Sequence, residues 1–417
     1  MFKKTLLTAG AIIIIFIAGA FGWYFFSPQT FPLTKLFSSN TTKDTPQGDE
    51  KNFFPFGSGE GTNSSQTNGE ASASEQTTSQ TEEASFGPLQ KISDSPISGF
   101  GLFEDKKDGL FVLYSERETG HIWKAFLGGG GKERISNTTI PRVYESVFLD
   151  EKHILFRYLA NDDKTIESFL GTLTFATTTA GEKMGSIDGI FLKKNILAVS
   201  KSPVNSSFFF LTKTDSGSDG YISSSDGKKQ AKIFSSETDE WLPVWIKESE
   251  IILTTKPSSK EAGYVFALNP KTGSFKKLSA GGLGLTASLG GEGKTFISAG
   301  GRGPTLALYD EGKNSVIPSP FKTLAEKCAW SRNEKGVYFC ATPKDLPKGE
   351  YPDSWYQGAI HFSDEIWKIN LKTNETNLSF SSEVPMDIEN ITLSSKDDFT
   401  VFRNKNDLLL YKATFTK

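Results

Sequence analysis

The chain repeats one hydrophobic pattern seven times between residues 98 and 403. Each copy contains an apolar segment, a short polar turn and a second apolar run that is rich in aromatic or β-branched residues. The copies follow one another at a mean step of roughly 48 residues, which is in the range of four-stranded propeller blades. The second runs occupy residues 110–114, 154–158, 208–211, 251–253, 295–297, 337–339 and 399–402.

The second run of each copy is nearly all apolar, whereas the next run alternates between apolar and polar residues. A continuous apolar run is typical of a strand that neighbouring sheets cover on both faces. The alternating runs at 121–125, 365–369 and 409–413 share one register, which indicates equivalent positions in a repeat. We therefore predict an all-β fold over residues 88–417, a seven-bladed β-propeller of four-stranded antiparallel blades.

The last repeat contains only three strand candidates, at residues 388–393, 399–402 and 408–412. Residues 88–93 have the pattern of a fourth strand, and they lie directly before the first hairpin. We predict that this strand completes the last blade and closes the ring, because closure removes an open sheet edge.

The amino-terminal segment predicts a membrane anchor. Residues 5–26 carry no charge and would span roughly 33 Å as a helix, and Lys3 and Lys4 before them favour a cytoplasmic amino terminus. We assign residues 1–27 to a cytoplasmic stub and a transmembrane helix. A secreted protein that is cleaved near Ala20 is the alternative. Both interpretations place the propeller on the extracytoplasmic side.

Residues 28–87 have the composition of a disordered linker. They are rich in Ser, Thr, Gly and Glu, and such a segment buries too little apolar surface to offset the entropy of ordering.

The whole chain has a net charge of −3, and its globular part is close to neutral. A neutral domain lacks the basic surface of nucleic-acid-binding proteins, so we expect no nucleic-acid partner.

Two short motifs resemble those of known propellers. Lys201-Ser-Pro203 resembles part of the Ser-Pro-Asp-Gly hairpin of the TolB type, and residues 269–273 resemble a turn of surface-layer and quinoprotein propellers. The chain thus resembles the WD-like (WD40-like) and TolB-like propellers of bacterial envelopes over residues 88–417, although the His and Trp-Asp dipeptides of true WD repeats are absent. The resemblance implies a rigid platform for binding or assembly, and a fold alone does not confer function.

Known catalytic motifs find little support in the sequence. Residues 290–295 look like the end of a phosphate loop, but Ser288 stands where the motif needs glycine. The chain contains three histidines and no Gly-x-Ser-x-Gly elbow. We expect neither catalysis nor a cofactor, apart from one candidate calcium loop. That loop places Asp215, Asp219 and Asp226 at positions 1, 5 and 12, and two Asp-Gly turns are the alternative.

The sixth repeat carries an insertion with clustered aromatic residues. Tyr351, Trp355, Tyr356 and His361 lie between its second and third strands, on the same face as the loops that enter each blade. Large, rigid aromatic side chains can stack on sugars or anchor a peptide. The alternative is that the insertion folds over its own blade. The entering loops add Glu240, Trp241 and Asp387 to the candidate binding residues.

Cys328 and Cys340 flank the sixth hairpin symmetrically, so they predict either a cross-strand disulfide or two buried thiols.

We expect the whole chain to be a membrane-tethered, extracytoplasmic platform that binds an envelope protein or a glycan. The alternative is an envelope glycan hydrolase that uses paired acids such as Glu240 and Asp387. Two acids about 5 to 10 Å apart in a cleft would support hydrolysis, and salt-bridged acids would not.

Overall fold

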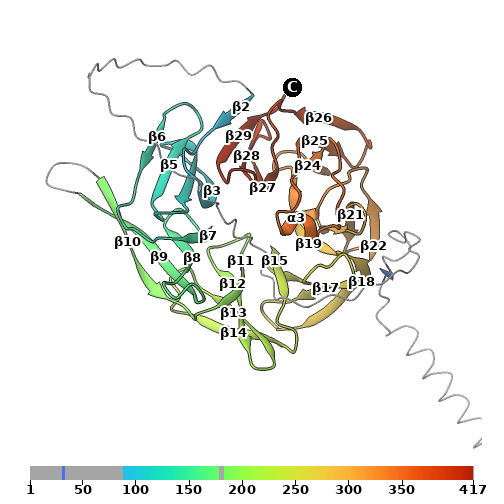
Figure 1. Cartoon of the computed structure of the whole chain (residues 1–417), viewed down its shortest axis with the longest axis horizontal. Helices are drawn as coiled ribbons and strands as arrows, with labels where there is room; N and C mark the ends of the chain where they lie inside the picture. The colour runs from blue at the N-terminus through green and yellow to red at the C-terminus, as the bar shows by residue number, and fades with distance from the viewer. Residues whose placement is uncertain (1–30, 33–87, 178–182, 417) are drawn as a thin grey trace, which may run out of the picture.

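The computed structural model describes residues 31–32, 88–177 and 183–416. Residues 88 to 416 form seven sheets that are arranged around a common axis, and Figure 1 looks down this axis. Each blade contains four antiparallel strands, which are consecutive in one repeat except at the ring closure, and one sheet has a fifth, parallel strand at its edge. The all-β, seven-bladed propeller that the hydrophobic pattern predicts is confirmed.

The blades are numbered in chain order, and their strands are listed from the inner to the outer edge. Blades one to three contain β3 (Ile97–Asp105), β4 (Gly109–Glu116), β5 (Ile122–Phe126) and β6 (Lys132–Arg134); β7 (Val143–Phe148), β8 (His153–Leu159), β9 (Ile166–Thr177) and β10 (Lys183–Phe191); and β11 (Ile196–Lys201), β12 (Phe208–Thr214), β13 (Gly217–Ser223) and β14 (Gln230–Ser236). Blades four and five contain β15 (Trp241–Lys247), β16 (Glu250–Thr255), β17 (Ala262–Leu268) and β18 (Phe275–Leu283); and β19 (Thr286–Gly291), β20 (Lys294–Ala299), β21 (Thr305–Asp310) and β22 (Ser315–Pro318). Blades six and seven contain β23 (Cys328–Trp330), β24 (Val337–Pro343), β25 (Asp364–Asn370) and β26 (Thr376–Phe380); and β27 (Ile388–Leu393), β28 (Phe399–Asn404), β29 (Leu410–Thr414) and β2 (Leu89–Lys91).

The second strand of each blade forms the core because it is covered by both neighbouring blades. In β12, residues 208–211 are fully buried, with Phe208 and Phe210 facing blade two and Phe209 and Leu211 facing blade four. The hydrophobic clusters therefore lie between adjacent blades. This arrangement is the physical reason why the second apolar run of each repeat does not alternate.

The strand before the first blade supplies the outer strand of the last one. β2 pairs with β29 in antiparallel register, with Leu89 opposite Ala413 and Lys91 opposite Tyr411. The backbone N–H of Ile92 donates to the carbonyl of Leu410 at 2.8 Å, which extends this seam beyond the strand. Figure 1 shows the two segments side by side near the carboxyl terminus.

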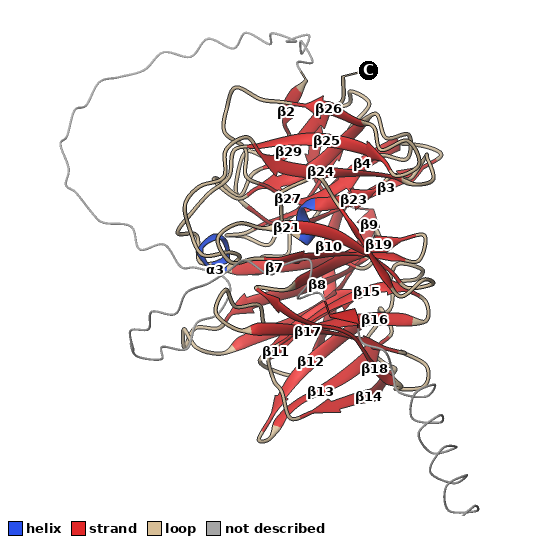
Figure 2. Cartoon of the chain, turned by 90° about the vertical axis from the view of Figure 1, so that its right-hand side faces the viewer, coloured by secondary structure: helices blue, strands red, loops and turns tan. Residues whose placement is uncertain are grey.

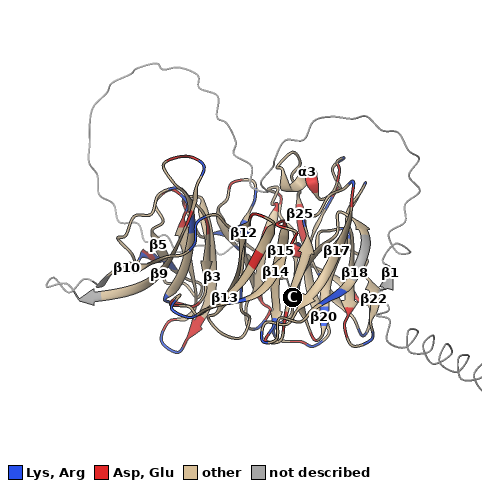
Figure 3. Ribbon diagram, turned by 90° about the horizontal axis from the view of Figure 1, so that it is seen from below, with Lys and Arg blue, Asp and Glu red and all other residues tan. Residues whose placement is uncertain are grey.

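Strand order decides which loops share a face of the ring. The loops that join second to third strands, and the loops that join one blade to the next, all lie at the same end of the sheets. The short helix α3 (Asp353–Tyr356) belongs to such a loop, and Figure 3 shows it at one end of the ring. We call this end the insertion face. Figure 2 shows that strands make up nearly all of the ring's regular structure.

The predicted membrane anchor (residues 1–27) lies outside the described residues, as does the predicted linker (residues 28–87) apart from β1 (Phe31–Pro32). This two-residue strand pairs in parallel with β18. Within the described part of the chain, no helix has the length and apolar character needed to cross a membrane. The anchor and the disordered linker therefore stay predictions.

Candidate functional site

The insertion of blade six is a small packed unit that lies over its own blade and the neighbouring ones. It joins β24 to β25 and includes α3, whose buried residue is Trp355. Tyr351 is 0% exposed and Trp355 is 3% exposed, and both pack with Phe362 and Leu324. The expectation that Tyr351 and Trp355 form an exposed stacking surface is wrong for this structure, because both side chains are buried in the cluster that packs the insertion against the ring.

Polar contacts join the insertion to blade four and to the connections on both sides of blade six. The indole Nε1 of Trp355 donates to both carboxylate oxygens of Asp387, before β27, at 3.0 Å. The Tyr356 hydroxyl donates to Glu326, which lies in the 3-10 helix η1 (Ala325–Lys327) between blades five and six. Asp353 accepts from the backbone N–H of Ser259, in blade four, at 2.6 Å.

Three fully buried ionisable side chains meet beneath the insertion. The Lys327 Nζ lies 2.7 Å from an oxygen of Asp364 and 2.7 Å from an oxygen of Asp387, and each of the three side chains is 0% exposed. Burial raises the pKa of Asp364 to about 6. For Lys327, burial opposes the charged form, but the two carboxylates outweigh it and raise the pKa of the ammonium.

The other predicted binding residues are dispersed. Glu240 is exposed and pairs with Lys256 at 2.6 Å. Trp241 is buried between blades three and four, whereas His361 is 49% exposed, with its Nδ1 3.7 Å from Asp387. Glu240 and Asp387 are each ion-paired with a different lysine. Such salt-bridged acids do not meet the requirement that we set for a glycan hydrolase.

The predicted calcium loop is wrong. Residues 217–223 form strand β13, so Asp215 and Asp226 lie in the turns at its opposite ends. Asp219 lies within the strand and is bound by Lys232 at 2.7 Å and Ser235 at 2.6 Å. Among the described residues, no group of three or more His, Cys, Asp or Glu side chains could hold a metal ion.

The two cysteines face each other across the first two strands of blade six. Cys328 of β23 is opposite Cys340 of β24, and their sulfur atoms form a disulfide. Both side chains are buried within the cluster between blades five and six. Of the two alternatives that the symmetric spacing allows, the structure therefore contains the disulfide.

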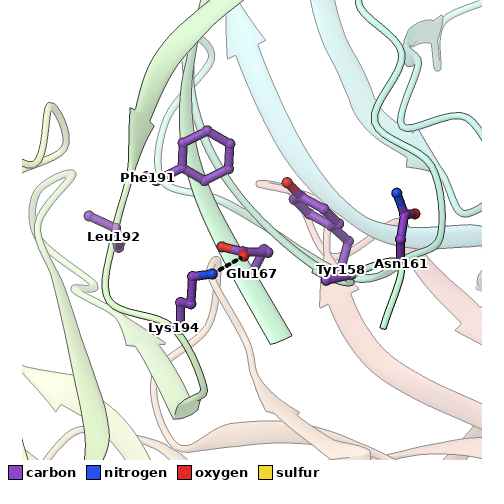
Figure 4. Close-up of a pocket in the computed structure, with 7 residues that line it drawn as sticks. Tyr158, Asn161, Glu167, Phe191, Leu192 and Lys194 are labelled. Atoms are coloured by element: carbon purple, nitrogen blue, oxygen red, sulfur yellow. Dashed lines mark ion pairs between the residues drawn. The ribbon is translucent and has the colours of Figure 1, made fainter. Parts of the chain in front are cut away.

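A pocket that sequence reasoning missed opens in blade two. It has a volume of about 440 Å³ and is lined by Tyr158, Ala160, Asn161, Glu167, Phe191, Leu192 and Lys194. These residues lie at the end of β8, at the start of β9 and at the end of β10, so the pocket lies on the insertion face. Figure 4 shows the ring of Phe191 and the ring of Tyr158 on either side of an ion pair between Glu167 and Lys194.

The pocket combines apolar rings with satisfied charges. Phe191 is 63% exposed, although its ring also contacts Phe169 with 5.2 Å between centroids. The Lys194 Nζ lies 2.9 Å from Glu167, and this hydrogen bond raises the pKa of the ammonium. Burial and the Glu167 carboxylate raise the pKa of Tyr158, so its hydroxyl stays protonated at neutral pH. The lining residues come from three separate segments of the sequence, so no local motif marks this pocket.

Comparisons with known proteins support the fold. No protein-family model and no curated protein sequence matches the chain. The Pan2 WD40 domain of Neurospora crassa has a TM-score of 0.50 and 12% identity, and the match covers 79% of this chain and 98% of that one. The WD40 repeats of RRP9 have a TM-score of 0.49 and 10% identity, with 79% and 97% covered.

A puromycin-hydrolyzing peptidase of Mycobacterium tuberculosis has a TM-score of 0.47 and 12% identity, and the match covers 75% of this chain. The chain spans about half of that peptidase, since 51% of the peptidase is covered. At such identities, structural similarity shows the fold alone. The chain is thus a β-propeller of WD40-like fold.

Proposed function

We propose that this chain is a membrane-tethered, extracytoplasmic platform that binds an envelope protein or a glycan through its insertion face. The pocket of blade two is the observation that carries this proposal. An aromatic ring that is mostly exposed, next to a second ring and an ion pair, offers both apolar area and hydrogen-bonding groups to a partner. The strands that hold these side chains belong to a rigid ring, so little ordering entropy is lost on binding.

The insertion adds to this face without supplying the stacking surface. Of the binding residues predicted in the insertion, His361 is exposed, and the partly exposed Tyr356 donates to Glu326. We infer that the insertion shapes the face, while Phe191 and Tyr158 provide the contact area. WD40 domains such as that of Pan2 share the fold, and a platform role is compatible with it. Catalysis is not part of the proposal.

The test compares two exposed phenylalanines of one hairpin. Phe191 lines the pocket, whereas Phe175 is 52% exposed near the opposite end of β9 and does not line it. The full-length chain, in detergent, is immobilised and exposed to a cell-envelope extract. We expect the Phe191→Ala variant to lose at least about tenfold in captured material, because an aromatic anchor contributes about 1.4 kcal/mol or more. The Phe175→Ala variant should capture as much as the unmodified chain.

Treatment of the extract identifies the class of partner. Protease treatment should abolish capture of a protein, and periodate, which cleaves vicinal diols, should abolish capture of a glycan. Equal capture by the Phe191→Ala variant and the unmodified chain would remove the blade-two pocket from the proposal. No capture by the unmodified chain from any fraction would contradict the platform function itself.

A further inference from the structure

The buried cluster of Lys327, Asp364 and Asp387 has a geometry that goes beyond an ordinary ion pair. Lys327 ends η1, Asp364 begins β25, and Asp387 directly precedes β27. All three side chains are 0% exposed. The rings of Trp355 and Phe362 lie 5.0 Å and 4.9 Å from the Lys327 Nζ, so water is excluded from the cluster.

The two oxygens of Asp364 have very different surroundings. Oδ2 accepts from the Lys327 Nζ at 2.7 Å and from the backbone N–H of Ile388 at 2.8 Å. Oδ1 is buried and has no hydrogen-bond partner among the described residues. A buried carboxylate oxygen without a partner carries a desolvation penalty that nothing in the site offsets.

Asp387 is placed to move a proton. Its Oδ1 lies 2.7 Å from the same Nζ, and it also accepts from Trp355 at 3.0 Å. Its Oδ2 accepts from the backbone N–H of Phe362 at 3.1 Å. These donors fix the orientation of the carboxylate, so one of its oxygens stays directed at the amine.

We propose that Lys327 and Asp364 condense to an intramolecular isopeptide bond, with Asp387 as the proton carrier. Asp387 accepts a proton from Nζ, and the amine lone pair attacks Cγ of Asp364. A C–N bond forms, the bond from Cγ to Oδ1 breaks, and two protons of the former ammonium leave with Oδ1 as one water molecule, relayed through Asp387. The step needs no oxidant, reductant or cofactor.

The product satisfies the site better than the reactants do. Oδ2 becomes the amide oxygen and keeps the hydrogen bond from Ile388, and the remaining N–H donates to Asp387. The unpartnered Oδ1 is removed, and the charges of Lys327 and Asp364 are replaced by one neutral amide, while Asp387 keeps its hydrogen bonds from Trp355 and Phe362. Holding the two groups in contact replaces a bimolecular encounter, which is worth effective molarities of about 10⁵ M or more in well-oriented systems.

Protonation equilibria are compatible with this step. Burial raises the pKa of Asp364 to about 6, so this carboxylate accepts protons onto its departing oxygen more readily than an exposed aspartate does. The two carboxylates raise the pKa of Lys327 despite its burial, which disfavours the free amine, so the attack requires transfer of a proton from Nζ to Asp387, the second carboxylate in contact with it. The bond would close a loop around the whole insertion, directly beside the disulfide at Cys328.

Mass spectrometry of the full-length, reduced and denatured chain tests the proposal. The mass difference between the unmodified chain and the Lys327→Met variant is compared with the difference that the substitution alone gives. We expect the unmodified chain to be lighter by one further water molecule, and this comparison cancels any processing of the amino terminus. Proteolysis should then yield a single branched peptide that contains Lys327 and Asp364 and lacks cleavage after Lys327.

Three further variants test the separate roles of Asp387, Asp364 and the neighbouring Lys405. Asp387→Asn keeps the shape but cannot carry the proton, and should retain the full mass. Asp364→Ala removes the carbon that the amine attacks and should retain the full mass. Lys405→Met is the control, because the Lys405 ammonium contacts the Trp355 ring and neither carboxylate oxygen, so the water loss should persist. An unmodified chain at full mass, or a water loss that survives Lys327→Met, would overturn the proposal.

Discussion

At the scale of single residues, Trp355 shows why an aromatic cluster has two opposite interpretations. A tryptophan in a long loop can be a binding surface or the core of that loop, and composition does not distinguish these. In the structure, Trp355 is 3% exposed and donates to the buried Asp387. The deciding partners, Leu324 and Asp387, are far from the insertion in sequence, so sequence alone could not identify the residue as core.

This burial predicts a large effect of one substitution. Trp355→Ala should lower the free energy of unfolding by about 3–5 kcal/mol, because it opens a cavity and leaves Asp387 without its indole donor. Chemical denaturation of the purified protein measures the change. Val384→Ala is the matched control, since Val384 is exposed, and it should stay within about 0.5 kcal/mol. A Trp355→Ala variant of unchanged stability would return this residue to the candidate binding surface.

Glu326 predicts a pH dependence of stability. Burial raises its pKa above 4.5, and the hydrogen bond from Tyr356 only partly opposes the shift. The folded state therefore binds the Glu326 proton more tightly than the unfolded state does. Its stabilising contribution is present below the unfolded pKa and is lost as the pH rises through the folded pKa.

Replacing Glu326 with a residue that does not titrate should reduce the pH dependence of the free energy of unfolding. In Glu326→Gln, the loss of stability between acidic and neutral pH should be smaller than in the unmodified chain, because an amide does not titrate. Denaturation midpoints over a pH series measure this difference. Glu383→Gln, at an exposed position, should leave the profile unchanged. Parallel profiles for Glu326→Gln and the unmodified chain would contradict the prediction.

At the scale of elements, the seam between β2 and β29 predicts the most sensitive segment of the ring. Ile92 is buried, and the Ser93 hydroxyl accepts from the backbone N–H of Leu410 at 2.9 Å. Replacing residues 88–93 with a Gly/Ser spacer of equal length should lower the Tm by on the order of 5–10 °C. Thermal melting followed by circular dichroism measures it. The same replacement of residues 82–87 is the control, and equal Tm values for both would show that the seam does not hold the ring.

Elements were predictable where burial alone determines the pattern. The run at 208–211 could be assigned to a doubly covered strand because all four side chains are apolar, and β12 confirms it. Polar segments were not predictable in this way. The acids around β13 match a calcium loop in spacing, but backbone pairing with β12 and β14 extends the segment and separates them. The pocket was missed because Tyr158 and Phe191 come from different strands.

At the scale of the whole molecule, strand order converts local features into one face. The insertion of blade six and the pocket of blade two are far apart in the sequence, yet both lie on the insertion face of the ring. In the view of Figure 3, acidic and basic residues are mixed along the strands and loops of the ring, and the basic residues are not gathered on one side as nucleic-acid binding would require. Recognition on this face therefore depends on shape, aromatic area and single ion pairs.

The complete chain is predicted to be anchored in a membrane by its amino-terminal segment. The 22 residues from 5 to 26 contain no charge, and Lys3 and Lys4 precede them. We expect the full-length chain to remain in the membrane fraction after carbonate washing, whereas a chain without residues 1–27 should not. Protease added to intact cells or spheroplasts should digest the propeller, because the lysines favour a cytoplasmic amino terminus.

The secreted alternative gives a different result in the same fractions. Cleavage near Ala20 would leave a mature amino terminus close to that residue and would release the chain from the membrane. Amino-terminal sequencing of the membrane-bound and released pools separates the two outcomes. A propeller that stays protected in spheroplasts and is digested only after lysis would contradict both, because each places the insertion face, and any partner that it binds, outside the cytoplasm.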